Sequence, residues 1–185
     1  MLSLIAAGTF TVLLGLDVLL KQHVEENIKS GEEKKVLGGK VVIRKVYNKG
    51  FLLNSLESHP VLIKTVSILA GAGVLACGAW TFVRKGHFTE KLGMAILGAG
   101  AASNLFDRLS RGKVIDYIGI WSKNQFLARL TANLGDFYIL LGAVLLALKR
   151  SYPELSEEEL KEISEKVKSR KFKLWGCRLI PIFKL

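Results

Sequence analysis

The chain has 185 residues, of which 50% are hydrophobic, with a mean hydropathy of +0.31 and a formal net charge of +11. Such an apolar composition excludes an ordinary soluble domain of this size and fits one small helical membrane domain. The basic residues lie mainly in loops and in the C-terminal tail, so we expect anionic membrane lipids, and no nucleic acid, as their partners.

Four apolar stretches could cross a bilayer, whose hydrocarbon core needs about 20 helical residues. They are residues 3–20, 61–83, 92–109 and 133–148. No basic segment precedes the first stretch and Asp17 interrupts it, so we expect a retained span and no cleaved signal peptide. The pattern predicts a mainly α membrane protein with four transmembrane helices, which form a domain over residues 1–149.

A small β element is predicted between the first two spans, at about residues 34–58. Two β-type runs flank Gly38 and Gly39, a pattern typical of a hairpin. Residues 44–51 continue it as strand and turn. Residues 114–121 also favour an extended conformation, at the membrane interface, with Trp121 as a headgroup anchor.

Residues 150–185 form a separate basic tail. Ser156 and Glu159 make a capping box that opens an amphipathic helix ending near Val167. Two interpretations stay open: the helix lies on the inner membrane surface, or it is solvated.

The distribution of basic residues favours one orientation in the membrane. Arg84, Lys85 and Lys91 crowd into the short connection between the second and third spans. Lys and Arg number 13 on each side of the four spans, so the totals do not decide the orientation, but this short loop favours a cytoplasmic location for the connection under the positive-inside rule.

Acidic residues mark the ends of the last two predicted spans. Asp107 and Asp116 follow the third span and Asp136 begins the fourth, so all three share one membrane surface. Asp17 and Lys21 are spaced as an ion pair on one helix.

Two of these acids have no cation close in sequence. Arg108 is expected to neutralise Asp107, which then has a structural role, whereas Asp116 and Asp136 are left as a candidate pair. Two adjacent carboxylates share a proton and titrate as a unit. The ionised member can deprotonate a water while the protonated member polarises a carbonyl group.

Four motifs follow one another along the chain. They are Asp17-x-x-x-Lys21, Asn48-x-Gly50, Asn104-Leu-Phe-Asp107-Arg108-x-x-x-Gly112-x-Val114-x-Asp116-Tyr117, and Asn133-Leu-Gly135-Asp136. Over about residues 10–148 the chain resembles lipoprotein signal peptidase (signal peptidase II), a family of bacterial intramembrane aspartic peptidases.

The resemblance implies a four-helix fold in the bacterial cytoplasmic membrane, with both termini cytoplasmic and a β cradle and active site near the outer face. It implies cleavage of prolipoproteins just before the diacylglyceryl-modified cysteine, with Asp116 and Asp136 as the catalytic dyad. Supporting or substrate-contacting positions would be Asp17, Lys21, Asn48, Gly50, Asn104, Arg108 and Asn133. We expect a monomer with no metal and no other cofactor.

The chain departs from the family pattern at several positions near these motifs. Phe51, Leu52 and Leu53 replace the usual two alanines and phenylalanine, which would reshape the substrate groove. Ser103 replaces a common glycine. Ala132 and Gly135 replace a phenylalanine and an alanine.

The sequence leaves three other functions to compare with this one. Membrane acids also serve proton-coupled transporters, although relays usually place them near the midplane. Lys64 and Ser67 could form a serine/lysine peptidase pair. A phospholipid headgroup transferase would need a cluster of acids for a metal, which the spacing does not offer.

Overall fold

The computed structural model describes residues 1–50, 58–84, 87–151 and 164–167. The chain divides into one compact unit of residues 1–148 and a second unit of residues 149–185. In the second unit residues 164–167 are helical, whereas the predicted capping box at Ser156 lies outside the described residues.

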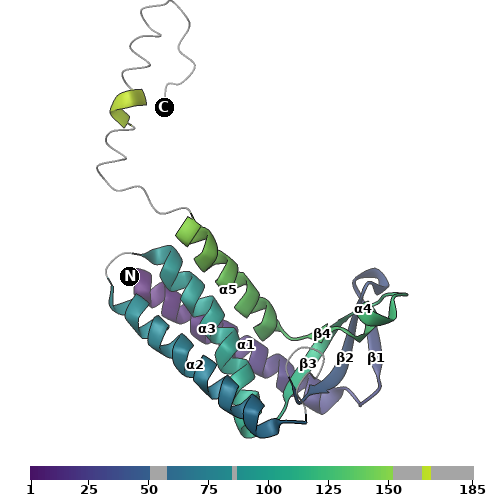
Figure 1. Cartoon of the computed structure of the whole chain (residues 1–185). Helices are drawn as coiled ribbons and strands as arrows, with labels where there is room; N and C mark the ends of the chain where they lie inside the picture. The colour runs from purple at the N-terminus through teal and green to yellow at the C-terminus, as the bar shows by residue number, and fades with distance from the viewer. Residues whose placement is uncertain (51–57, 85–86, 152–163, 168–185) are drawn as a thin grey trace, which may run out of the picture. The chain divides into compact units, whose positions relative to one another are not determined.

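The four predicted apolar stretches form the long helices of the first unit (Figure 1). These helices are α1 (Leu2–Asn27), α2 (Pro60–Val83), α3 (Phe88–Ser110) and α5 (Leu134–Ser151). The first runs beyond the predicted end at residue 20, because residues 21–27 are polar but include good helix formers. A proline begins α2, where its missing N–H costs nothing.

Two of these helices are long and apolar enough to cross a membrane, over residues Ser3–Asn27 and Pro60–Val83. Large apolar side chains remain exposed on all four long helices, as expected for surfaces that face lipid. By composition α3 is less apolar, because it carries Glu90 in its first turn and Arg108 in its last.

The small β element is confirmed as an antiparallel four-stranded sheet in the order β1-β2-β3-β4. Its strands are β1 (Glu33–Val36), β2 (Val41–Asn48), β3 (Val114–Ile120) and β4 (Thr131–Ala132). The predicted hairpin joins β1 to β2 through the turn η1 (Leu37–Gly39), where Gly38 and Gly39 adopt the positive φ that favours glycine.

The sheet is larger than predicted, because the segment expected at the membrane interface is its third strand. β3 pairs with β2 so that Asp116 lies opposite Val46. Alternate residues of β3 face opposite sides. Ile115 and Tyr117 pack on Val24 at the end of α1, which leaves Asp116 on the other face.

Helices α3 and α5 approach each other through four glycines. Gly93 lies against Gly142, and Gly100 lies against Gly135. The two glycines of each helix are seven residues apart, and the order of the contacts shows that the helices are antiparallel. A Cβ atom built on Gly100 would come within 2.1 Å of the Gly135 carbonyl oxygen. This backbone contact places the start of α5 directly beside α3.

We predict that Gly100→Ala forces α5 away from α3 and lowers thermal stability by about 1–3 kcal/mol, because overpacking in a tight contact shifts backbone. Thermal unfolding in detergent measures the effect. Gly73→Ala in α2 is the matched control, because its new Cβ would meet nothing within 4 Å. Equal stability of the two variants would contradict the backbone contact.

Candidate active site

The site is built around the buried ammonium group of Lys21, which is 1% exposed. Its Nζ atom lies 3.0 Å from the Asp17 carboxylate and 3.2 Å from that of Asp107. It also donates to Ser103 Oγ at 2.9 Å and to Asn104 Oδ1 at 2.8 Å. The predicted Asp17–Lys21 ion pair is therefore confirmed, and it joins α1 to α3 as well.

Asp107 forms ion pairs with residues other than Arg108, the partner that the sequence suggested. Among the described residues it binds Lys21 and Arg111, and it accepts from the backbone N–H of Ile115 at 3.3 Å. Consecutive helix residues do not face one another, whereas residues four apart do. Arg108 instead donates to the Gly50 carbonyl at 3.1 Å.

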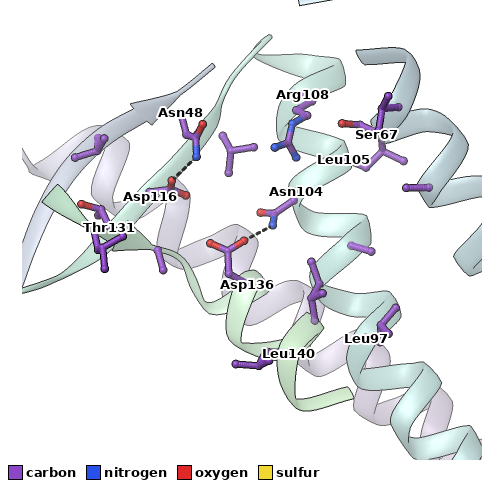
Figure 2. Close-up of a pocket in the computed structure, with 18 of the residues that line it drawn as sticks. Asn48, Ser67, Leu97, Asn104, Leu105, Arg108, Asp116, Thr131, Asp136 and Leu140 are labelled. Carbon is purple, nitrogen blue, oxygen red and sulfur yellow. Dashed lines mark hydrogen bonds between the residues drawn. The ribbon is translucent and has the colours of Figure 1, made fainter. Parts of the chain in front are cut away.

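Asn104 connects the Lys21 cluster to Asp136. Because its Oδ1 accepts from Lys21, its amide group is oriented so that Nδ2 donates to Asp136 Oδ1 at 2.8 Å (Figure 2). The other carboxylate oxygen accepts from the Asn133 N–H at 3.1 Å, while Asn133 Oδ1 accepts from the Asp136 N–H at 3.0 Å. This reciprocal pair is a capping box that begins α5.

Asn133 also contacts the second candidate carboxylate. Its Nδ2 donates to Asp116 Oδ1 at 2.7 Å. Asn48 Nδ2 donates to Asp116 Oδ2 at 3.0 Å (Figure 2). The Asn48 amide is oriented in turn by the Gly50 N–H, which donates to Asn48 Oδ1 at 3.0 Å. One residue, Asn133, thus binds both Asp116 and Asp136.

The environment of Asp116 favours a proton on its carboxyl group. Burial raises the pKa of Asp116 to about 6, and the nearby Asp136 charge also raises it. The hydrogen bonds from Asn48 and Asn133 act in the opposite direction, because they stabilise the carboxylate form.

Both carboxylates line a cavity of about 1150 Å³ in the first unit. Its walls come from α2, α3, α5, the sheet and the short helix α4 (Gln125–Arg129). The α2 and α5 walls are mainly apolar: Val66, Ala70, Val74, Ile139, Leu140 and Ala143. The arrangement can hold an apolar chain with a peptide bond beside two carboxylates.

The position of Ser67 bears on the serine/lysine alternative. Ser67 Oγ is buried in the cavity wall without a hydrogen-bond partner in the described structure, and Lys64 is exposed. The Ser67 hydroxyl is therefore not activated by Lys64.

Three further residues of the site were missed in the sequence. Ser103, noted only as a departure, donates to Asp17 at 2.6 Å, and Arg111 binds Asp107. The Tyr117 hydroxyl donates to Asp17 Oδ1 at 3.0 Å, and burial raises the pKa of Tyr117, so the phenol stays a neutral donor. The position of Arg111 four residues after Asp107 on one predicted helix is a sequence signal for their ion pair.

Among the residues that depart from the family pattern, Gly135 lies where there is no room for a side chain. A Cβ there would lie 2.9 Å from both Asn133 Oδ1 and Asp17 Oδ2. Ala132 lines the cavity. Residues 51–53 lie outside the described structure.

Comparison with known proteins identifies the family of this chain. Residues 9–151 match the family described as Signal peptidase (SPase) II. The chain belongs to the signal peptidase II family. It is therefore a peptidase, and its apolar helices embed it in a membrane.

Two relatives of this signal peptidase II chain are named lipoprotein signal peptidase. One, from Streptococcus pneumoniae, is 25% identical over 155 residues, covering 82% of this chain and 95% of the relative. The other, from Fusobacterium nucleatum, is 30% identical over 158 residues, covering 81% and 88%.

A solved structure described as a bacterial membrane enzyme, determined by the in meso method at 2.3 Å resolution, has a similar fold. Its TM-score is 0.66 at 19% identity, covering 84% of this signal peptidase II chain and 93% of that chain. A second structure with the same description, at 1.9 Å resolution, has a TM-score of 0.65.

We predict that Asp107→Asn mainly destabilises the protein, by about 3 kcal/mol, because it removes one charge from a buried ion-pair cluster. The midpoint of thermal unfolding in detergent measures the loss. Glu32→Gln is the matched control, because Glu32 pairs with Lys34 on the surface and its loss should leave unfolding unchanged. An unaltered midpoint for Asp107→Asn would contradict the structural role.

Proposed function

We propose that this protein is an aspartic endopeptidase that removes signal peptides from prolipoproteins, using a water activated by Asp116 and Asp136. The observation that carries the proposal is the position of Asn133, which hydrogen-bonds both carboxylates at the wall of one cavity. A single rigid residue between two acids supports a fixed, proton-sharing pair.

The surroundings of the two acids support different roles. Asp136 lies in the first turn of α5, where the helix dipole stabilises negative charge, so it acts as the base that deprotonates water. Asp116, whose pKa is raised by burial, holds the proton and donates it to the scissile carbonyl oxygen. The two then exchange roles as the tetrahedral intermediate collapses and the amine leaves.

Asn48, Asn104 and Asn133 are the residues that hold the dyad. Lys21 fixes Asn104 directly, while Asp17 and Asp107 act on it through Lys21. Each asparagine donates its amide N–H to a carboxylate and has its own oxygen held by another group. Neutral donors orient the carboxylates without adding charge, and burial together with the Asp136 charge keeps the Asp116 pKa raised in spite of these hydrogen bonds.

The cavity walls support a lipid-modified substrate. The apolar faces of α2 and α5 would bind the acyl chains, and the carboxylates would lie at the bond before the modified cysteine. The names of the relatives support prolipoproteins as the substrate class. The matched family gives no support to a proton-coupled transporter.

We further propose a monomer with four transmembrane helices in the bacterial cytoplasmic membrane. The apolar exteriors of α1, α2, α3 and α5 support four spans. The site lies where α1 and α3 end and α5 begins, which supports a position near one membrane surface. The basic residues around Arg84 support a cytoplasmic location for the opposite end and for both termini.

We predict that Asp116→Asn and Asp136→Asn each lower cleavage by about 10³-fold or more, because neither amide can exchange the proton that the reaction requires. A gel-shift assay of a diacylglyceryl-modified precursor measures cleavage, and an unlipidated precursor should not be processed. Glu32→Gln, which alters a surface ion pair with Lys34, is the control variant.

Both variants should fold, because asparagine preserves the size of aspartate and its Oδ1 can keep one of the two hydrogen bonds that each carboxylate accepts. Processing at the wild-type rate by both would refute the dyad. Activity should persist in EDTA, and its loss there would indicate a metal instead.

We predict that kcat/KM falls as pH rises through the pKa of Asp116, about 6, because the active dyad carries one proton. Replacing Asn48 by alanine removes a donor that lowers this pKa, so the decline should move to higher pH. Cleavage rates from about pH 4 to about pH 9 at subsaturating substrate measure both profiles. A shift to lower pH in Asn48→Ala would contradict the assignment.

A further inference from the structure

We propose that Arg44 is a positioning residue that fastens the segment 125–132 over the substrate cavity and so sets substrate binding. This inference rests on the proposed function for its substrate. Arg44 belongs to β2 and is outside the motifs that carry the family resemblance, and its guanidinium group is not part of the dyad network.

The guanidinium group binds the segment at several points. Arg44 Nη2 donates to the carbonyl of Ala128 at 2.6 Å and to that of Leu130 at 3.1 Å. Nε and Nη2 both donate to Thr131 Oγ1, at 3.0 and 2.7 Å. These acceptors include carbonyls at the C-terminal end of α4, where a cation is favoured by the helix dipole.

The segment so fastened forms one wall of the cavity. Gln125, Phe126 and Arg129 of α4 and Thr131 of β4 all line it. α4 has only five residues, and a helix that short is not stable by itself. β4 pairs with β3 over two residues alone. Arg44 therefore supplies contacts that the segment's own secondary structure does not.

Gly119 of β3 makes room for this arrangement. Arg44 reaches from β2 across β3 to β4, and a Cβ on Gly119 would lie 3.0 Å from Arg44 Nε and 3.1 Å from Nη2. The glycine is not required by its backbone, because no positive φ occurs there. A glycine at residue 119 is therefore explained by the Arg44 guanidinium group, which occupies the space that a side chain would need.

The consequence for catalysis is specific. The carboxylates are held by three asparagines that Arg44 does not contact, so loosening the segment leaves the dyad in place. The cavity wall becomes less preorganised, and the substrate must order it on binding. Loss of Arg44 therefore raises KM and spares kcat.

The test combines kinetics with amide hydrogen exchange on the full chain in detergent. Arg44→Ala is expected to raise KM about tenfold and to change kcat by no more than about twofold, with faster exchange in residues 125–132. Arg44→Lys, which keeps the charge but loses the planar fork, should fall between. Lys34→Ala, an exposed cation on β1, is the control and should match wild type.

A double-mutant cycle decides the mechanism. Gly119→Ala alone should raise KM and exchange, because the new methyl displaces the Arg44 guanidinium. In the Arg44→Ala background the same change should add nothing, since its target is gone. If Arg44→Ala fails to fold, the single variants Arg44→Lys and Gly119→Ala still test the expected changes in KM and exchange.

Unchanged exchange in residues 125–132, unchanged KM, or additive effects in the cycle would overturn the proposal. Failure of the wild-type protein to cleave a diacylglyceryl-modified precursor would instead refute the proposed function, and the exchange measurements would still test the Arg44 contacts.

Discussion

The structure depends on one buried cation, the ammonium group of Lys21. It has four oxygen acceptors on two helices, with Asp17 on its own helix and Asp107, Ser103 and Asn104 on α3. Removing one partner from such a buried cluster costs about 3–5 kcal/mol, because a charge is left uncompensated. The same contact that joins the helices also fixes the Asn104 amide toward Asp136, so stability and the geometry of the site have a common origin.

From Lys21 outward, the site is a series of oriented amides rather than a series of charges. Asn104, Asn133 and Asn48 each accept on their oxygen and donate to a carboxylate. Arginine or lysine in these places would hold both carboxylates ionised, since an adjacent cation lowers a carboxyl pKa. An asparagine amide orients a carboxylate and lowers its pKa only through a neutral hydrogen bond, without adding a full charge. On the proposed function, this is why two acids in an apolar cavity can keep one proton between them.

Much of the fold could be predicted from the sequence, because long apolar runs and a Gly-Gly turn are local signals. The ion pair of Asp107 with Arg111 follows from helix geometry, which brings residues four apart together, whereas adjacency in the sequence points only to Arg108. Tyr117 and Asp116 are neighbours on opposite faces of the sheet, one in the core cluster and one at the cavity. This follows from strand alternation only once the strand is known. The elements α4 and β4 have only five and two residues, which is too little local pattern to predict them. The contacts of Arg44 with this segment depend on pairing between parts of the chain that are distant in sequence.

The glycine contacts between α3 and α5 act as a register between the two helices. Gly93 and Gly100 match Gly142 and Gly135 because seven residues separate the members of each pair. Each helical residue turns the chain by about 100°. Suppose that one residue is inserted or deleted between Gly135 and Gly142 while the Gly93–Gly142 contact stays formed. The start of α5 would then rotate by that angle about the helix axis and carry Asp136 away from the Asn104 amide. The spacing of these small residues is as much a constraint on the site as the identity of the acids.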